Sequence, residues 1–348
     1  MSALILGPEE LRQIIHRAGL HDVMDELIQR LEAALLAFDS EEIEVPIRSG
    51  FNYELPHAGL VEWMPLYQRG KFVTLKVVGY HPNNPQRAGM PSVLSSVTRY
   101  DTKTGQLCAL IDGTFPTALR TAAASVVASR LLAIPSSNTL GFVGCGAQAV
   151  SQAHAMSRAF PLSKILYVDT DLDAQASFSR RLRDVVSETV ELQAAPLEKI
   201  ISDSDIVCTA TSIGVGEGPL FENLPHKNHL HINAVGSDFP GKTELPLEFL
   251  ERAVVCPDFL RQALHEGECQ QLDAAKIGPD LATLIACAGD KASWQQQPSV
   301  FDSTGYALED DVVMTLFLDL AERLNIGRRQ TIESYASDPK DPYEFLGA

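Results

Sequence analysis

The sequence lacks several patterns that mark familiar classes of protein. Its six cysteines form no C-x-x-C pair, so neither a zinc site nor a disulfide framework is indicated, and we predict no bound metal. Neither a G-x-S-x-G turn nor an H-E-x-x-H helix occurs, which argues against two common classes of hydrolase. Scattered, unpaired cysteines are typical of reduced thiols, and we therefore expect a cytoplasmic protein.

Positive charge and long apolar runs are also scarce. With 28 Lys and Arg against 45 Asp and Glu, the formal net charge is −17, which is unsuited to neutralising nucleic-acid phosphates. No run of about 18 apolar residues is present, and acidic residues occur by position 9 in place of a basic signal region. We therefore expect no nucleic-acid partner, no membrane span and no signal peptide. The 348 residues and 45% hydrophobic content instead predict about two ordered domains.

The most informative segment present is the run TLGFVGCGAQA at residues 139–149. Gly144 permits a tight turn after an apolar strand, Gly146 lets the backbone approach a pyrophosphate, and Ala149 allows close packing of the following helix. Asp169 ends the next apolar run, where it can accept a hydrogen bond from a ribose hydroxyl and repel a 2′-phosphate. This pattern predicts NAD, in preference to NADP. An ordinary α/β turn without a ligand is the alternative.

The apolar periodicity before this turn predicts a separate, mostly β region. Residues 8–38 have helical spacing, strand-like segments recur between residues 44 and 111, and an Ala-rich helix is expected at 116–132. After the turn, apolar runs recur at the spacing of βα units, which indicates a parallel sheet, and a strong helix is predicted at 309–324.

These patterns predict an α/β fold with two domains. A Rossmann-type, doubly wound domain is expected at residues 131–309. An α+β substrate domain is expected at residues 1–130, completed by a C-terminal helix that leaves the Rossmann part and returns within residues 310–348.

Three cations, Arg48, Lys76 and Arg120, lie in segments that are otherwise apolar or rich in small residues. Buried cations need anionic partners. Spacing alone favours structural ion pairs with the chain's own acids. The alternative is a bound carboxylate, which an Arg can hold with two parallel hydrogen bonds and beside which a desolvated Lys can transfer protons.

The strand-like run at residues 229–235 opens into a loop that carries Asp238 and Lys242. Loops at the carboxyl ends of strands carry the sites of α/β folds, so this pair belongs either to a site or to a solvated turn. His229 and His231 belong to an H-x-x-H-x-H pattern, but alternation along a strand supplies no third convergent ligand.

Several separated segments together resemble the ornithine cyclodeaminase/mu-crystallin family. They are KVVGYHPNN at 76–84, TALRTAA at 117–123, GCGAQ at 144–148, NAVGSD at 233–238, PGKTEL at 240–245 and DSTGYALED at 302–310. The resemblance covers about residues 45–325. It implies a homodimer in which the N-terminal region and the returning C-terminal helix form the substrate-binding and dimerisation domain.

The resemblance also implies roles for individual residues. Asp238 would be the catalytic acid and base at the substrate's side-chain amine, with Lys76 as a second catalytic residue at the α-carboxylate. The substrate-binding residues would be Arg48, Glu62, Lys76, Arg120, Asp238 and Thr304. The cofactor-binding residues would be Ser92, Arg120, Gly144, Gly146, Ala147, Gln148, Asp169, Thr211, Val235, Gly236, Ser237, Lys242 and Ser303.

Asp238 followed by PGKTEL is similar to the cyclodeaminase branch of the family. The resemblance implies that NAD⁺ oxidises L-ornithine at Cα, that the product closes on its own δ-amine and loses ammonia, and that the same NADH reduces the ring to L-proline. Thr304 stands where an apolar residue is frequent, which leaves a lysine cyclodeaminase as an alternative. An amino-acid dehydrogenase or ketimine reductase, and a non-enzymatic binding protein, are further alternatives.

Overall fold

The computed structural model describes residues 2–287, 289 and 291–346. The chain forms two compact units. The first comprises Met1–Gly19, Asp39–Thr114 and Met314–Ala348, and the second comprises Leu20–Phe38 and Phe115–Val313. No helix within the described part of the chain is both long and apolar enough to cross a bilayer.

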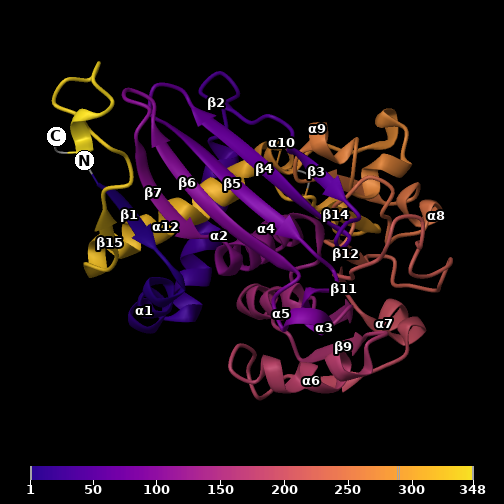
Figure 1. The fold of residues 1–348 in the computed structure, drawn as a ribbon. Coiled ribbons are helices and arrows are strands. Elements are labelled where there is room, and N and C mark those ends of the chain that lie inside the picture. The colour runs from indigo at the N-terminus through magenta and orange to yellow at the C-terminus, as the bar shows by residue number, and fades with distance from the viewer. Residues whose placement is uncertain (1, 288, 290, 347–348) are drawn as a thin grey trace. The chain divides into compact units, whose positions relative to one another are not determined.

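The first unit is built on an eight-stranded, mostly antiparallel sheet of described residues (Figure 1). Its strands follow the order β15-β1-β7-β6-β5-β4-β2, and β3 also pairs with β4. The elements are β1 (Ala3–Leu6), α1 (Pro8–Ala18), β2 (Ile43–Glu44), β3 (Ser49–Tyr53), β4 (Gly59–Gln68), β5 (Phe72–Tyr80), α3 (Asn84–Ala88), β6 (Val93–Asp101), β7 (Leu107–Asp112), β15 (Arg328–Gln330) and η4 (Glu344–Leu346). β1 runs parallel to β7 and antiparallel to β15, so the N-terminal strand lies between these two strands.

One face of this sheet is buried because its strands alternate in side-chain direction. Across the strands, Met64 pairs with Lys76, Lys76 with Val97, Val97 with Ile111 and Ile111 with Leu6. All five side chains are buried. Lys76 therefore occupies a position within an apolar layer.

The second unit contains a seven-stranded parallel sheet among its described residues, in the order β10-β9-β8-β11-β12-β14-β13. Its strands are β8 (Thr139–Val143), β9 (Lys164–Val168), β10 (Glu191–Ala194), β11 (Ile206–Thr209), β12 (His231–Ala234), β13 (Val254–Pro257) and β14 (Ser299–Asp302). Its helices are α2 (Leu20–Leu36), α4 (Thr114–Leu132), α5 (Ala147–Ala159), α6 (Leu172–Leu182), α7 (Leu197–Asp203), α8 (Leu247–Leu250), α9 (Leu260–Ala263), η1 (Glu268–Gln271), η2 (Ala274–Lys276), α10 (Leu281–Ala286) and α11 (Lys291–Trp294). The last long helix, α12 (Ala307–Leu324), begins in this unit and ends in the first.

Both faces of the parallel sheet are buried, which explains why its strands read as continuous apolar runs. On one face Phe178 of α6 packs edge-on against Phe142 and Tyr167, with ring centroids 5.5 Å and 5.1 Å away. On the other face, Val207 and Ile232 belong to a cluster with apolar residues of α7 and α8. Strand order reverses between β8 and β11, and α/β sheets bind their ligands beyond the carboxyl ends of the strands at such a position.

The structure confirms the predicted α/β fold with a parallel sheet and a mostly β region before it. The first of the strand-like segments, for which the sequence predicts residues 44–48, is wrong in position, because β2 ends at Glu44 and β3 begins at Ser49. The predicted domain boundaries at residues 130 and 309 stay predictions.

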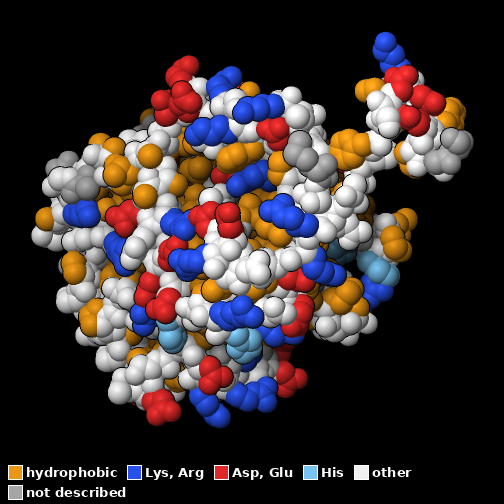
Figure 2. Space-filling view, turned by 90° about the vertical axis from the view of Figure 1, so that its left-hand side faces the viewer, with side chains coloured by type: hydrophobic (Ala, Val, Ile, Leu, Met, Phe, Trp, Pro, Cys, Tyr) orange, Lys and Arg blue, Asp and Glu red, His pale blue; other side chains and the backbone are white. Residues whose placement is uncertain are grey.

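Charged side chains of both signs are interspersed over the face that Figure 2 shows. The chain's solvent-accessible ion pairs include Lys164–Glu191, at 3.0 Å, and Lys276–Glu251, at 2.7 Å. Each such pair contributes at most about 1 kcal/mol, so the apolar cores dominate the stability of the two units.

Candidate active site

The predicted glycine turn joins strand β8 to helix α5. Gly144 has a φ of +95°, and a Cβ there would lie 2.6 Å from the carbonyl oxygen of Ala210, so this close approach requires glycine. A Cβ on Gly146 would meet no atom of the described residues within 4 Å. Gly146 is the N-cap of α5 and provides no side chain to cap it, so the amides of the first turn are available to an anion. Ala147 and Gln148 begin that turn.

Asp169 follows strand β9 directly and faces the glycine turn. Its Oδ2 accepts a hydrogen bond of 2.6 Å from the Cys145 N–H, and its own N–H donates to Gln175 Oε1 at 3.0 Å. Arg181 donates from Nη2 to the carbonyl oxygens of Cys145 and Ala174, at 2.6 Å and 2.7 Å. Main-chain contacts thus hold an acid beside the turn, as ribose recognition requires.

Cys145 lies inside the turn but is unsuited to nucleophilic chemistry. Burial, together with the neighbouring Asp169 carboxylate, raises the pKa of its thiol to about 12. The thiol is therefore neutral at physiological pH, and a thiolate is the reactive form.

Two further loops leave the carboxyl ends of β11 and β12. Thr211 donates from both its N–H and its hydroxyl to Glu244, at 2.9 Å and 2.7 Å. The Ser237 hydroxyl donates to the Lys242 carbonyl at 2.6 Å, which closes the loop that carries Asp238. Lys242 Nζ lies 3.4 Å from Asp238 Oδ1; the lysine side chain is buried, whereas 42% of the aspartate side chain is exposed. Asp238 is therefore accessible and has a cationic neighbour.

Ser303 and Thr304 follow strand β14 at the same edge of the sheet. The Ser303 hydroxyl is buried and has no hydrogen-bond partner among the described residues, as suits a group that binds a ligand. The Thr304 hydroxyl donates to Asp258 at 2.9 Å and accepts from Gln262 Nε2 at 2.8 Å.

Arg120 projects from α4 into a buried cluster of acids. Its Nη1 lies 2.6 Å from Glu309 Oε2, and its Nε lies 3.2 Å from Asp310 Oδ1. Burial raises the pKa of the Glu309 carboxyl to about 8, a shift that the Arg120 charge opposes. Gly305 packs directly on the guanidinium, since a Cβ there would lie 2.3 Å from Nη1. The structural ion pair favoured from spacing is thus present at Arg120, and it fixes the direction of the guanidinium.

The other predicted substrate residues belong to the first unit. Arg48 Nη1 lies 3.6 Å from Glu62 Oε2, and both side chains are largely buried. The β3–β4 and β4–β5 registers pair Gly50 with Glu62 and Met64 with Lys76, which places Glu62 and Lys76 on the same face of the sheet. Ser92 precedes β6, and its carbonyl accepts from the His81 N–H at 2.8 Å.

The second unit therefore brings one group of predicted site residues to the carboxyl edge of its parallel sheet. They are Gly144, Gly146, Ala147, Gln148, Asp169, Thr211, Val235, Gly236, Ser237, Asp238, Lys242, Ser303 and Thr304. Their roles in binding and catalysis stay predictions.

Sequence reasoning missed a set of buried carboxylates at this edge. Glu244, Glu268, Asp302 and Glu309 have fully buried side chains, and the first three accept main-chain hydrogen bonds from neighbouring loops. The available signal was an acid within an apolar context, as in the runs TEL at 243–245 and VFD at 300–302.

The histidines of the H-x-x-H-x-H pattern have separate structural partners. His229 Nε2 lies 3.1 Å from Asp205 Oδ1, and His231 Nδ1 lies 2.9 Å from the Ser299 hydroxyl. Burial lowers the pKa of His231 to about 3, so its imidazole is neutral. Within the described residues, no three His, Cys, Asp or Glu side chains are grouped to hold a metal ion.

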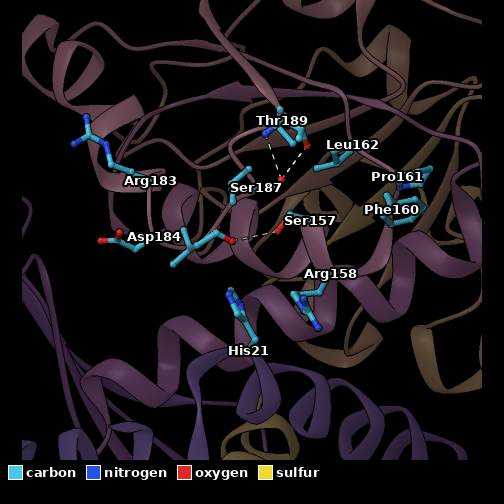
Figure 3. A pocket seen from close by; sticks show the side chains of 13 residues that line it. His21, Ser157, Arg158, Phe160, Pro161, Leu162, Arg183, Asp184, Ser187 and Thr189 are labelled. Carbon is cyan, nitrogen blue, oxygen red and sulfur yellow. Dashed lines mark hydrogen bonds between the residues drawn. The ribbon is translucent and has the colours of Figure 1, made fainter.

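A separate pocket of about 410 Å³ lies between α2, the end of α5 and the segment that joins α6 to β10 (Figure 3). Its wall includes His21, Ser157 and Arg158, and the Ser157 hydroxyl donates to the Val185 carbonyl at 3.4 Å. None of the residues predicted to bind substrate or cofactor lines it.

Comparison with known proteins relates the whole chain to one group of enzymes. The sequence profile of the ornithine cyclodeaminase/mu-crystallin family matches residues 9–324. The L-lysine cyclodeaminase of Streptomyces rapamycinicus is 39% identical over 99% of this chain and 100% of its own length.

Solved structures of related enzymes have the same fold as this chain. A lysine cyclodeaminase, whose structure concerns recognition of L-lysine, L-ornithine and L-2,4-diaminobutyric acid, has a TM-score of 0.95 and 46% identity, covering 99% of this chain and 100% of the other. An archaeal alanine dehydrogenase dimer with bound NAD has a TM-score of 0.84 and 29% identity, covering 96% and 100%.

Proposed function

The chain belongs to the ornithine cyclodeaminase/mu-crystallin family, and from this premise we propose that it is an NAD-dependent cyclodeaminase of a basic amino acid. The observation that carries the proposal is the edge of the parallel sheet, where the glycine turn, Asp169 and the loop with Asp238 converge. The family profile confirms the predicted family membership, and the parallel sheet confirms the predicted fold.

The cofactor is NAD, as the sequence predicts and as its presence in the related alanine dehydrogenase supports. The uncapped N-terminus of α5 would hold the pyrophosphate, and Asp169 would accept from a ribose hydroxyl. The buried Ser303 hydroxyl offers a further hydrogen bond. When bound, NAD supplies the acceptor and later the donor of a hydride.

The chain's own residues would hold the substrate and move its protons. Arg48, Lys76 and Arg120 would bind the α-carboxylate, and Asp238 would accept a proton from the side-chain ammonium so that the amine can attack the oxidised Cα. Ring closure is intramolecular, so positioning alone contributes much of the acceleration. Glu62, which pairs with Arg48, would orient that arginine.

L-lysine is the favoured substrate, with pipecolate and ammonia as products, because the chain is 39% identical to a lysine cyclodeaminase over 99% of its length but 29% identical to an ornithine cyclodeaminase over 97%. The main sequence prediction was L-ornithine with proline as product, and its lysine alternative is now better supported. Ornithine remains the second candidate, because the related lysine cyclodeaminase structure concerns its recognition as well.

The decisive assay incubates the purified protein with each amino acid and a catalytic amount of NAD⁺. Pipecolate and ammonia formed in equal amounts from L-lysine, without accumulation of NADH, would support the proposal. Faster turnover of L-ornithine to proline would restore the first prediction. NADH that rises with ammonia would identify a dehydrogenase, and absence of product from every basic amino acid would refute a cyclodeaminase.

We also propose that the protein is a homodimer. On the face of the first unit's sheet opposite Lys76, Phe51, Val77 and Leu94 are 70%, 36% and 39% exposed, and Phe51 stacks edge-on against Trp63. Such an apolar face suits a self-complementary interface, and the related alanine dehydrogenase is a dimer. Light scattering on a sizing column tests this, since a monomeric mass at micromolar concentration would contradict it.

The protein is proposed to act in a reducing compartment such as the cytoplasm. All six cysteines are free thiols in the structure, and four of them are buried. Proteins of oxidising compartments more often use their cysteines in disulfides.

A further inference from the structure

Glu244 is a fully buried carboxylate that joins two strand ends of the parallel sheet. Its Oε2 accepts hydrogen bonds from the Thr209 hydroxyl at 2.6 Å and from the Gly236 N–H at 2.9 Å. Its Oε1 accepts from the N–H and the hydroxyl of Thr211, at 2.9 Å and 2.7 Å. The loop after β11 and the loop after β12 therefore meet on one side chain.

Glu244 is itself fixed by a second and a third buried carboxylate. Glu268 accepts from the N–H groups of Glu244 and Leu245, at 2.7 Å and 3.2 Å. Asp302, the last residue of β14, accepts from the N–H groups of Glu268 and Cys269, both at 2.8 Å. Each carboxylate thus holds the main chain of the segment that carries the next, and the series ties three strand ends together.

The chemistry of the Glu244 contacts requires a carboxylate. Every partner of Glu244 is a donor, and both of its oxygens accept two hydrogen bonds, so an amide in either orientation would turn an NH₂ group toward donors. The fit is also tight, because a Cβ on Gly236 would lie 2.3 Å from Glu244 Oε1. Burial raises the pKa of the Glu244 carboxyl, which its four hydrogen bonds oppose.

Burying three carboxylates is costly, and the cost is offset only where their hydrogen bonds are complete. Apolar residues would hold the strand ends together at a lower cost. The position of the three carboxylates beside the predicted site explains why they occur there in place of apolar residues. Glu244 holds Thr211 and Gly236 directly, and Ser303 follows Asp302 in the chain. All three of these neighbours are predicted to contact the cofactor, and Asp238 follows Gly236 by two residues.

We propose that Glu244 is a positioning residue that fixes the Thr211 loop and the Gly236–Ser237–Asp238 segment relative to each other, so that Asp238 meets the substrate in a productive geometry. The inference rests on the proposed function and extends it to a fully buried residue that acts through its neighbours. Because it acts through Asp238, its loss should lower kcat more than it changes KM.

The test replaces Glu244→Gln, which keeps the shape of the side chain and removes its acceptor-only character. We expect kcat to fall about 10²-fold, the usual effect of displacing a catalytic group by about 1 Å, with a much smaller change in KM. Hydrogen–deuterium exchange should rise in the peptides that contain Thr211 and Gly236. Unchanged kcat with unchanged exchange would overturn the proposal.

Asp205→Asn is the matched control, because Asp205 accepts from the N–H groups of Asn138 and Thr139, at 2.9 Å and 3.0 Å, at the opposite edge of the sheet. It should lower the thermal midpoint as Glu244→Gln does but leave kcat unchanged. Equal losses of kcat in both variants would show that Glu244 acts only through general stability.

Glu268→Gln provides a second variant in case Glu244→Gln fails to fold. It disturbs Glu244 only through the main chain, so it should lower kcat in the same direction by a smaller factor, and an unchanged kcat would contradict the series. A wild-type protein without cyclodeaminase activity would refute the proposed function, whereas active wild type with an active, unperturbed Glu244→Gln variant would refute the positioning role alone.

Discussion

Gly305→Ala tests whether the direction of the Arg120 guanidinium governs substrate binding. Gly305 has a φ of +76°, and an added Cβ would lie 2.3 Å from Arg120 Nη1 and 2.7 Å from Nη2. Ordinary contact begins at 3.4 Å, so the guanidinium must move by about 1 Å. It cannot do so freely, because Glu309 and Asp310 hold it at 2.6 Å and 3.2 Å.

The expected magnitude has two parts. A positive φ costs a non-glycine residue about 1–2 kcal/mol, and displacing a buried arginine from its carboxylates adds up to about 3–5 kcal/mol. If Arg120 binds the substrate α-carboxylate, a displacement of about 1 Å should also lower kcat/KM for the amino acid about 10²-fold. Affinity for NAD should fall by a smaller factor, because Arg120 is only one of the predicted cofactor-binding residues and the glycine turn is untouched.

Gly105→Ala is the matched control. Gly105 has a φ of +78°, but a Cβ there would meet no described atom within 4 Å, so the substitution isolates the backbone cost. Urea unfolding and steady-state kinetics with the amino acid varied would be measured for both variants. The reasoning is refuted if Gly305→Ala is no less stable than Gly105→Ala and keeps the wild-type kcat/KM.

Three further predictions concern the candidate site and the second unit. Asp238→Asn should abolish turnover while NAD binding, followed by fluorescence, stays near wild type; an active Asn variant would remove Asp238 from proton transfer. Asp169→Ala should weaken NAD binding and reduce the preference for NAD over NADP. Titration of the variant with both cofactors measures the ratio of the two affinities, and an unchanged ratio would contradict the prediction. His154 has its pKa lowered to about 4 by burial, with His21 and Arg158 adding to the shift and Asp25 opposing it. Because the folded state depresses this pKa, the contribution of neutral His154 to the free energy of unfolding is complete above about pH 6.5. The free energy of unfolding then decreases as the pH falls toward 4, by about 3 kcal/mol at most. His154→Gln should flatten this part of the stability profile in urea titrations, and a profile as steep as wild type would count against the assignment.

Local patterns made much of the fold predictable. Gly144 and Gly146 mark the turn because glycine directly after an apolar run permits the positive φ that Gly144 adopts, and the apolar runs around them follow the period of buried strands. The four residues of β1 carry too little pattern to identify a strand. That strand exists because β7 and β15 flank it, and neither is near it in sequence.

The candidate site was predictable only in part, for the same physical reason. Asp169 and Asp238 follow strand ends that the sequence itself marks, so their positions at the carboxyl edge of the sheet could be predicted. The partners of Glu244 and Arg120 could not. Glu244 binds residues 35 and 33 positions away, and Arg120 binds Glu309 across 189 positions, so both depend on which segments the fold brings together.

Thr304 illustrates how such contacts change the interpretation of a single position. The family resemblance implies that Thr304 adjusts specificity beside the substrate's side chain, yet its hydroxyl binds Asp258 and Gln262, and its methyl group lies 2.8 Å from where a Cβ on Gly267 would be. One methylene of substrate is worth about 1–3 kcal/mol of discrimination, and a buried polar group that loses its partner costs about the same. An apolar residue at position 304 would therefore disturb Asp258 and Gln262 as strongly as it could favour one substrate length. We therefore expect the preference for lysine or ornithine to depend on Thr304, Asp258 and Gln262 together.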